Sequence, residues 1–499
     1  MTERLAHAPG ASPSRGPRSL IFEQGAPESR CVEAPALDVP MSSVDDLLGG
    51  RVRTESPALP NVTELEIMRH YSHLASMNFG VDSGMYPLGS CTMKYNPRIN
   101  EVACRLPGFA GIHPYQPEET VQGALELMVE LSDALAEISG LPGVTLQPAA
   151  GAHGELASLM VIRAAHEARG NARKKVVIPD TAHGTNPATV AMCGYEVVTI
   201  LSDEKGQVDI EALKAALDED VAAFMLTNPN TVGLFDENIA EITAAVHAVG
   251  AYAYCDGANL NAILGKARPG DMGFDAMHIN LHKTFSTPHG GGGPGAGPIC
   301  VSEELAAFLP GPLAVRFDDG TFGLGWPEHT IGRVRSSYGN FGVLVRAYAY
   351  VRALGAAGLA DVAEQAVLSA NYLKVRLEGA FEVPYGRTCM HEFVMSGSKQ
   401  KRESGVRTLD MAKRLLDYGF HPPTVYFPLL VEEAMMIEPT ETEPLAALDA
   451  FAEVMLAIAE ESASDPELVK GAPYTTPVRR LDEAGAARNP DLRWKPSGE

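Results

Sequence analysis

The chain has 499 residues, of which 45% are hydrophobic and 21% are charged, and it contains 48 glycines and 36 prolines. This balance is typical of a globular protein and excludes a fibrous or largely disordered chain. Its 40 basic and 63 acidic residues give a formal net charge of −23, which opposes binding to nucleic acid or to anionic lipid because their phosphates repel an acidic protein. We therefore expect no nucleic acid and no membrane among its partners.

The cysteine pattern and the N-terminal segment bear on the compartment. The seven cysteines occur singly, with no C-x-x-C pair, which favours a reducing compartment and predicts no metal site. No apolar run reaches the roughly 18 residues that a bilayer requires, and the N-terminus lacks the apolar core of a secretory signal. We expect a cytoplasmic protein, with organelle targeting by the basic N-terminus (Arg4, Arg15, Arg18) as the alternative.

Composition and periodicity divide the first quarter of the chain into two parts. Residues 1–50 are rich in Pro, Ser, Gly and Ala and show no sustained apolar period, which predicts a disordered leader. Residues 51–125 form a predicted N-terminal helical arm, because NVTELEIMRHYSHLASMN after Pro60 has helical spacing. This helix leads into the irregular stretch from Tyr86 to Arg98.

Residues 126–310 alternate short apolar runs with helical periods, which predicts a large α/β domain with a mostly parallel sheet. The expected buried strands are KKVVIP, YEVVTI, AAFMLT, AYAYC, AMHINL and GPICV. Two helices between them should each bury one stripe: Leu156, Leu159, Met160 and Ala164 in one, and Ile239, Ile242, Val246 and Val249 in the other. Longer helical segments and short strands such as TVYFPLLV predict a smaller α+β C-terminal domain over residues 311–499.

Two predicted strands end in residues that carry chemistry, at the sheet edge where ligands of open α/β sheets bind. Asp256 follows AYAYC, and Lys283 follows AMHINL. A lysine at the end of a buried strand is costly unless it is paired, solvated or covalently modified. The run Gly290 to Gly293 next to it allows close backbone approach. Taken singly, the aspartate could cap a turn and the glycines could form a flexible loop.

Two further loops complete the set. In QPAAGAHGE, the backbone N–H groups around Gly151 and Ala152 open a helix expected to begin near Glu155, and this arrangement suits a phosphate monoester. In DTAHGTNP, His183 follows the strand KKVVIP, and Asn186 is expected to cap a helix. A histidine in such a loop could also have no catalytic role.

Together these loops offer what pyridoxal 5′-phosphate (PLP) requires of a protein. The QPAAGAHGE loop would hold the phosphate, and Asp256 would keep the pyridinium nitrogen protonated. Lys283 would supply the amine for covalent attachment, and His183 would stack on the ring.

Longer motifs carry a resemblance to a known family. The segments that carry it are YPLGSCTMKYNP (86–97), QPAAGAHGE, DTAHGTNPAT (180–189), LTNPNTVGLF (226–235), YCDGANLNAILGKARPGDMGFD (254–275), NLHKTFSTPHGGGGPG (280–295) and HPPTVYFPL (421–429). They closely resemble glycine dehydrogenase (decarboxylating), the P-protein family of the glycine cleavage system, from about residue 60 to residue 485.

The resemblance is to subunit 2 of the split bacterial form. It implies an aspartate-aminotransferase-like (fold type I) large domain and a partner subunit 1, in an α2β2 heterotetramer. It also implies that Lys283 is the PLP lysine and Asp256 the partner of the ring nitrogen, with His183 as the third catalytic candidate. The matching segments add further cofactor-binding candidates: Gly151, Ala152, His153, Thr231 and His282.

The implied reaction decarboxylates glycine, releases CO2 and transfers the aminomethyl group to the oxidised lipoyl arm of H-protein, so the family counts as an oxidoreductase of glycine catabolism. Candidates for the glycine carboxylate are Arg333, Arg335 and Lys94, each of which could equally be a surface or interface charge. One rival interpretation is another fold type I enzyme, an aminotransferase or lyase acting on a small amino acid. The other is a non-catalytic support subunit, which would have no need to bury Lys283 and Asp256.

Overall fold

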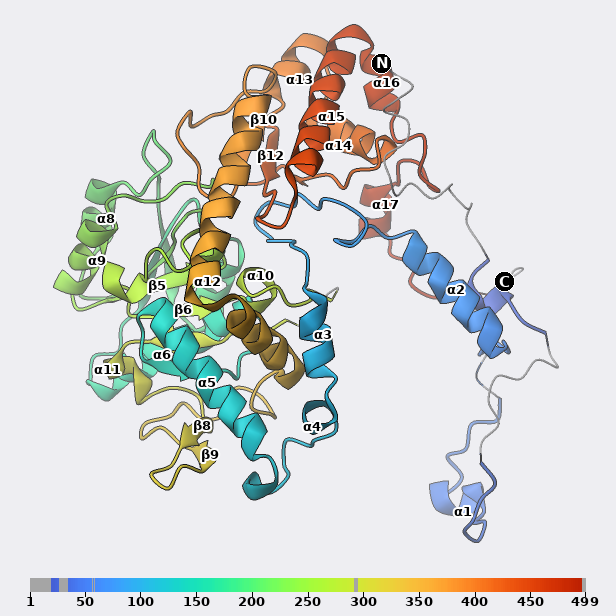
Figure 1. Cartoon of the computed structure of the whole chain (residues 1–499), viewed down its shortest axis with the longest axis vertical. Coiled ribbons are helices and arrows are strands. Elements are labelled where there is room, and N and C mark those ends of the chain that lie inside the picture. The colour runs from blue at the N-terminus through green and yellow to red at the C-terminus, as the bar shows by residue number, and fades with distance from the viewer. Residues whose placement is uncertain (1–18, 27–34, 56, 58, 291–294, 496–499) are drawn as a thin grey trace. The chain divides into compact units, whose positions relative to one another are not determined.

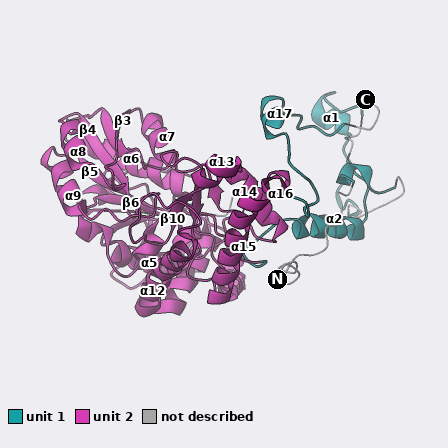
Figure 2. Ribbon diagram, turned by 90° about the horizontal axis from the view of Figure 1, so that it is seen from above, with its two compact units in different colours: residues 1–83, 472–499 teal, residues 84–471 magenta. Residues whose placement is uncertain are grey.

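The computed structural model describes residues 19–26, 35–55, 57, 59–290 and 295–495. The chain forms two compact units, residues 1–83 with 472–499 and residues 84–471 (Figure 2). Most of the expected leader, residues 1–18 and 27–34, lies outside the described residues, as do Gly291 to Gly293. The expected boundaries at 125 and 310 fall inside the second unit.

The first unit contains short helices. They are a 3-10 helix (Ile21–Glu23), α1 (Val44–Leu48), α2 (Glu64–Ser76) and α17 (Glu483–Arg488). The expected helix after Pro60 is confirmed as α2. It begins at Thr63, whose hydroxyl and backbone N–H both donate to the Glu66 carboxylate, while the backbone N–H of Glu66 donates to the Thr63 hydroxyl, a capping box that fixes the first turn.

The second unit is built on a seven-stranded sheet in the order β1-β7-β6-β5-β4-β2-β3. The strands are β1 (Gly143–Thr145), β2 (Lys175–Pro179), β3 (Glu196–Ile200), β4 (Val221–Thr227), β5 (Tyr252–Gly257), β6 (Ala276–Ile279) and β7 (Ile299–Val301). All pairs from β6 through to β3 are parallel, and β7 pairs antiparallel with both of its neighbours. The expected six strands and the mostly parallel sheet are confirmed.

Burial differs between the centre and the edge of this sheet. Every residue of β4 and β5 is buried, as their continuous apolar runs predict. In β3 only Ile200 is buried, so the expectation of a buried strand there is wrong. The reason is position, because β3 is an edge strand that pairs only with β2.

Helices cover the sheet (Figure 1). They are α5 (Gln122–Ser139), α6 (Gly151–Ala168), α7 (Thr185–Met192), α8 (Ile210–Ala216), α9 (Ile239–Ala248) and α11 (Glu303–Ala306). In α9 the expected stripe is confirmed for Ile239, Ile242 and Val246. In α6 the stripe is only partly right, since Leu159 is buried but Met160 is 37% exposed and Val161 lies in the core instead.

A second, three-stranded antiparallel sheet has the order β10-β12-β11. Its strands are β10 (Phe393–Ser396), β11 (Thr424–Val425) and β12 (Ala434–Ile437), and its helices are α13 (Ser398–Ser404), α14 (Thr408–Asp417), α15 (Leu445–Ser464) and α16 (Pro466–Gly471). The strand expected in TVYFPLLV covers only two residues. It ends at Val425, because the next residue, Tyr426, adopts a left-handed backbone (φ 58°).

The long helix α12 (Phe341–Leu377) connects the two sheets, packing against α5 at one end and α15 at the other (Figure 1). Its length and mean hydropathy would suffice to cross a bilayer, although no continuous apolar run of that length exists in the sequence. The helix breaks at Gly355 (φ 63°), and one face of it, which includes Leu344 and Leu373, lies in the two cores, whereas Leu354, Leu368 and Val375 are exposed. It is therefore a core helix of this unit.

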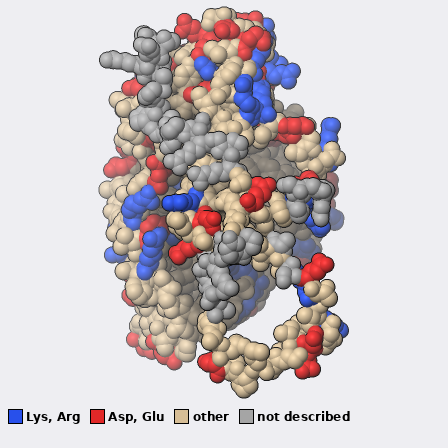
Figure 3. Space-filling view, turned by 90° about the vertical axis from the view of Figure 1, so that its right-hand side faces the viewer, with Lys and Arg blue, Asp and Glu red and all other residues tan. Residues whose placement is uncertain are grey.

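The remaining elements are short. They are α3 (Arg98–Cys104), α4 (Pro107–Ala110), α10 (Leu281–Thr284), a hairpin of β8 (Leu313–Arg316) and β9 (Phe322–Gly325), and the 3-10 helices Glu118–Thr120, Leu260–Ala262 and Pro269–Met272. On the face shown in Figure 3, acidic and basic side chains are interspersed.

Candidate functional site

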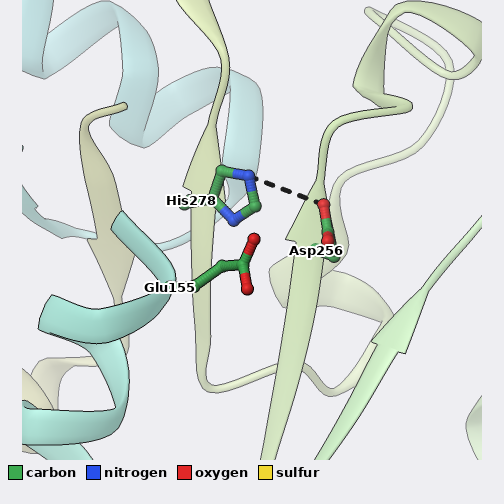
Figure 4. Close-up of side chains that lie close together, drawn as sticks. All are labelled: Glu155, Asp256 and His278. Carbon is green, nitrogen blue, oxygen red and sulfur yellow. Dashed lines mark ion pairs between the residues drawn. The ribbon is translucent and has the colours of Figure 1, made fainter. Parts of the chain in front are cut away.

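Asp256 lies at the carboxyl end of β5, directly beside His278 of β6 in the parallel register. Its side chain is buried, with 3% exposed. Oδ1 accepts a hydrogen bond from the backbone N–H of Ala258 at 2.9 Å, and Oδ2 accepts one from Asn186 Nδ2 at 3.1 Å. His278 Nε2 lies 3.5 Å from Oδ1 (Figure 4). The strand-end carboxylate is therefore held on three sides.

These contacts decide the charge of Asp256. Burial alone would raise the pKa of this carboxyl, but His278, the two hydrogen bonds and the nearby charge of Lys283 outweigh it and lower the pKa below the ordinary value. Asp256 is therefore ionised at neutral pH. An ionised carboxylate in a dry site needs a cationic partner, and a protonated ring nitrogen would supply one.

Tyr254 and Glu155 in turn hold the partners of Asp256 in place. The Tyr254 hydroxyl and His278 Nδ1 are 2.5 Å apart, which leaves Nε2 of the same ring to face Asp256. Glu155, from α6, points towards the same place (Figure 4) and accepts hydrogen bonds from Asn186 Nδ2 at 3.0 Å and Thr185 Oγ1 at 2.6 Å. Asn186 thus bridges two carboxylates and holds Asp256 in one orientation.

Lys283 lies on α10, the short helix that directly follows β6. Its side chain is 9% exposed, and Nζ donates a hydrogen bond to the backbone carbonyl oxygen of Ser90 at 2.9 Å. Ser90 belongs to the irregular stretch that the sequence placed between Tyr86 and Arg98. Because β5 pairs with β6, Asp256 and Lys283 lie at the carboxyl ends of neighbouring strands, and the charge of Lys283 contributes to lowering the pKa of Asp256.

The N-terminus of α6 faces the same sheet edge. The helix begins at Gly151, four residues earlier than expected, and its N-cap residue is Ala150, whose methyl side chain cannot cap the free N–H groups of the first turn. A Cβ on Gly151 would lie 2.6 Å from Asn280 Oδ1, and one on Gly154 would lie 2.7 Å from His278 Cβ. The glycines therefore let this helix start approach β6 closely.

The other predicted residues take up different positions around this edge. The backbone N–H of Ala149 donates to His153 Nδ1 at 3.1 Å, so this ring folds back over the start of α6. The Thr231 hydroxyl donates to the Thr181 carbonyl oxygen at 2.6 Å and ties the loop after β4 to the loop after β2. His183, in that second loop, is half-buried, with Nδ1 3.0 Å from the Thr185 hydroxyl.

His282 has different surroundings. Its Nδ1 accepts from the backbone N–H of Ala296 at 3.4 Å, and its ring lies edge-on to that of His289, with centroids 5.0 Å apart. Burial and the charge of Lys283 lower the pKa of His282 to about 4. The ring is therefore neutral at physiological pH, and it packs against the backbone of Gly295 and Ala296.

Asn186 has a role that the sequence did not predict. The N-cap residue of α7 is Gly184, so the expectation that Asn186 caps this helix is wrong. Because Asn186 sits in the first turn instead, its side chain is free to point inward to Asp256 and Glu155. Glu155 and His278 were also missed, and the available signal was a polar residue inside an otherwise apolar, buried segment.

The three candidates for a substrate carboxylate differ sharply. Lys94 is 2% exposed, and its Nζ lies 2.7 Å from Glu441 Oε1, so its charge is already neutralised. The Arg333 guanidinium stacks over the Trp326 ring at 5.5 Å. Arg335 donates to Asn340 Oδ1 at 2.8 Å, and its charge contributes to lowering the pKa of His153. Only Arg335 is thus placed beside the start of α6.

The residues present fit PLP. The first turn of α6 offers unpaired N–H groups to a phosphate, Asp256 is an ionised carboxylate in a dry site, and Lys283 offers an amine between them and the 86–98 stretch.

Comparisons with known proteins agree with this geometry. Residues 39–321 match the family described as "Glycine cleavage system P-protein", and residues 362–471 match "Glycine dehydrogenase, C-terminal domain". The "Probable glycine dehydrogenase (decarboxylating) subunit 2" of Caldanaerobacter subterraneus is 58% identical over 479 residues, which cover 95% of this chain and 98% of that one. The protein of the same description from Bacillus licheniformis is 58% identical over 481 residues, or 96% of this chain and 99% of that one.

Solved structures share the fold at low identity. A glycine decarboxylase (P-protein) in inhibitor-bound form matches 84% of this chain and 95% of its own, with a TM-score of 0.68 and 20% identity. Oryza sativa TDC with PLP and tryptamine matches 85% of this chain and 93% of its own, with a TM-score of 0.64 and 15% identity. These matches confirm the expected fold type I architecture. The extent of the sequence matches shows that this chain belongs to the glycine cleavage system P-protein family.

Proposed function

We propose that this chain is the cofactor-holding subunit of a glycine decarboxylase, an oxidoreductase of the class glycine dehydrogenase (aminomethyl-transferring). The observation that carries the proposal is the meeting of Lys283, Asp256 and the start of α6 at one sheet edge. It occurs in a chain that is 58% identical to a probable glycine dehydrogenase (decarboxylating) subunit 2. The reaction would convert glycine and the oxidised lipoyl group of H-protein into CO2 and the aminomethyl-lipoyl form.

The cofactor would be PLP, bound covalently through Nζ of Lys283. PLP supplies an electron sink for the bond that breaks at the substrate carbon. Asp256 would hold a proton on the ring nitrogen, and Asn186 and His278 would keep Asp256 ionised and oriented. The N–H groups of Gly151 and Ala152 would bind the phosphate, and His183 would lie against the ring.

The partners follow from the same proposal. The relatives are described as subunit 2, which supports a partner subunit 1, in an α2β2 assembly, and the lipoyl arm of H-protein would reach the site through a surface channel. Arg335 is the best-placed described candidate for the glycine carboxylate, since Lys94 is already paired. We place the enzyme in the cytoplasm.

The exchange of labelled bicarbonate into glycine tests this function. The purified chain is combined with subunit 1 and lipoylated H-protein, and the label in glycine is counted. We expect exchange that depends on all three proteins and is lost in Lys283→Ala. Transamination of a small amino acid without exchange would favour the rival fold type I enzyme. Exchange that persists in Lys283→Ala would leave this chain only a supporting role.

A further inference from the structure

Three buried ionisable side chains lie together at the end of the three-stranded sheet, where β10 begins and β12 ends. His391, Glu392 and Glu438 are 0%, 0% and 1% exposed, and one nitrogen or carboxylate oxygen from each lies within 4.8 Å of the others. The register explains the cluster. Phe393 of β10 pairs with Ile437 of β12 in antiparallel register. Glu392, which precedes Phe393, therefore lies beside Glu438, which follows Ile437.

Glu392 is linked to Lys283 through the backbone of Ser90. The Ser90 N–H donates to Glu392 Oε2 at 2.7 Å, and the Ser90 carbonyl oxygen accepts from Lys283 Nζ at 2.9 Å. Ser90 has a left-handed backbone (φ 67°), which is unfavourable for a non-glycine residue and persists only where surrounding contacts hold it. Asn259 Nδ2 also faces Glu392 Oε1, at 3.4 Å.

His391 cannot neutralise the two carboxyl groups. Its Nε2 lies 3.9 Å from Glu392 Oε1 and 4.0 Å from Glu438 Oε1, and neither ring nitrogen makes a hydrogen bond to a described residue. Burial and the charge of Lys283 lower the pKa of His391 to about 3. The imidazole is therefore neutral, and the cluster needs its positive charge from elsewhere.

Two carboxylates this close in a dry site do not both ionise. Burial raises the pKa of Glu392 to about 7 against the hydrogen bonds from Ser90 and Asn259 and the charge of Lys283. Burial and the neighbouring Glu392 raise the pKa of Glu438 well above its ordinary value, against Thr92 and Lys283. The two carboxyl groups differ in their hydrogen bonds, since Glu392 accepts from Ser90 and Asn259 whereas neither carboxyl oxygen of Glu438 makes a hydrogen bond to a described residue.

The other charged or titratable groups that face the cluster do not remove this difference. Glu441, which follows β12, raises the pKa of Glu438 further, although its own charge is paired with Lys94. Burial raises the pKa of the Cys91 thiol, which stays neutral beside His289 at 3.5 Å.

We propose that Glu392 and Glu438 share a single proton, held on Glu438, and that the carboxylate left on Glu392 positions Lys283 through the backbone of Ser90. Glu392 is thus a positioning residue, and Glu438 is the neutral acid that allows one negative charge, rather than two, to face Nζ. The inference rests on the proposed function only for the role of Lys283, because the proton and the contacts belong to the chain itself.

Two matched substitutions in the cofactor-bound protein separate the two roles. Glu438→Gln replaces a neutral acid by a neutral amide and keeps the local charge, whereas Glu392→Gln removes the charge. The control is Glu433→Gln, another buried glutamate of the same region, which is ion-paired with Lys401 2.9 Å away. Thermal unfolding of each variant checks that it folds.

Infrared difference spectra detect the shared proton, because a protonated carboxyl group has its own carbonyl stretch. Above the pKa of about 7 of Glu392, we expect the carbonyl stretch of one neutral carboxyl in the wild type and its loss in Glu438→Gln. An unchanged spectrum in Glu438→Gln would overturn the proposal. So would a stoichiometric divalent metal ion in the purified protein that Glu438→Gln removes, since a metal ion would then replace the shared proton.

The pH titration of the visible absorbance of the lysine-bound cofactor measures the charge on Glu392. We expect its midpoint to fall by roughly one to two units in Glu392→Gln, because one nearby negative charge is lost, and to move by less than about half a unit in Glu438→Gln and in the control. Equal shifts in Glu392→Gln and Glu438→Gln would mean that both groups are ionised and would refute the assignment. Neither readout uses glycine turnover, so failure of the bicarbonate exchange with both signatures intact would count only against the proposed function.

Discussion

Lys94 offers the sharpest test of how the 86–98 stretch is held to the rest of the unit. Its Nζ donates to Glu441 Oε1 at 2.7 Å, Asn261 Oδ1 at 2.8 Å, the Thr284 carbonyl oxygen at 2.8 Å and the Tyr350 hydroxyl at 3.3 Å. Burial opposes the charge, but the Glu441 carboxylate and the Tyr350 hydroxyl outweigh it and raise the pKa of Lys94. The lysine thus ties its own stretch to four distant parts of the chain from a buried position.

Replacing Lys94 by methionine keeps the apolar stem but leaves Glu441 buried without its cation. Breaking one side of a buried ion pair costs about 3–5 kcal/mol, because the remaining charge stays desolvated and unpaired. Glu441→Gln should cost a similar amount. The double variant Lys94→Met/Glu441→Gln should be less destabilised than the sum of the two, by an interaction free energy of about 2 kcal/mol.

Urea unfolding followed by circular dichroism gives the free energies for this double-mutant cycle. Lys174→Met is the control, because Lys174 pairs with Asp220 at 3.0 Å with both side chains exposed, and such surface pairs contribute less than about 1 kcal/mol. A loss below about 1 kcal/mol for Lys94→Met would refute the reasoning. An unchanged stability with a raised KM for glycine would instead identify Lys94 as a substrate ligand.

The remaining predictions concern the cofactor edge and the proton balance. Lys283→Ala should abolish both the visible absorbance of the bound cofactor and the bicarbonate exchange while circular dichroism shows an intact fold. Asp256→Ala should keep some cofactor but lower the exchange rate at least about a hundredfold, and near-normal rates would contradict its electrostatic role. Gly257→Ala should prevent folding or cost several kcal/mol, because a Cβ there would lie 1.9 Å from a backbone carbonyl oxygen of β6, whereas Gly123→Ala, with open space around it, should be neutral or stabilising in thermal unfolding. The pKa of Glu392 rises from 4.5 to about 7 on folding, so between these pH values the folded chain binds a proton that the unfolded chain has released. The free energy of unfolding should therefore fall as the pH rises through this range, by on the order of 3 kcal/mol. Urea titrations across this range should show that slope in the wild type and a flatter one in Glu392→Gln.

The cofactor edge could be predicted because its logic is local. Strands β2, β4, β5 and β6 are continuous apolar runs, and the carboxyl ends of parallel strands meet at one edge, so the loops carrying His183, Thr231, Asp256 and Lys283 had to lie near one another. Finer features could not be predicted. The exposure of Met160 and the edge position of β3 depend on which element packs where, and nothing in a periodicity states that.

The residues that sequence reasoning missed depend on register between distant segments. Glu392 and Glu438 are buried together only because β10 and β12 pair antiparallel from Phe393 and Ile437, and a slip of either strand by one residue would turn its carboxyl group to the other face of the sheet. Ser90 enters this region because the stretch that contains it runs along β12, where the backbone N–H of Gly89 donates to the Met436 carbonyl oxygen at 3.2 Å.

That dependence predicts which part of the site is more easily disturbed. The environment of Asp256 is built from neighbouring strands of one sheet, whereas that of Lys283 also needs the three-stranded sheet and the 86–98 stretch in register. A substitution that loosens the three-stranded sheet, such as Phe393→Ala in its core, should therefore release Lys283 from Ser90 before it affects Asp256. Hydrogen exchange should show faster exchange at the Ser90 N–H with unchanged protection in β5, and loss of protection in β5 first would contradict this order.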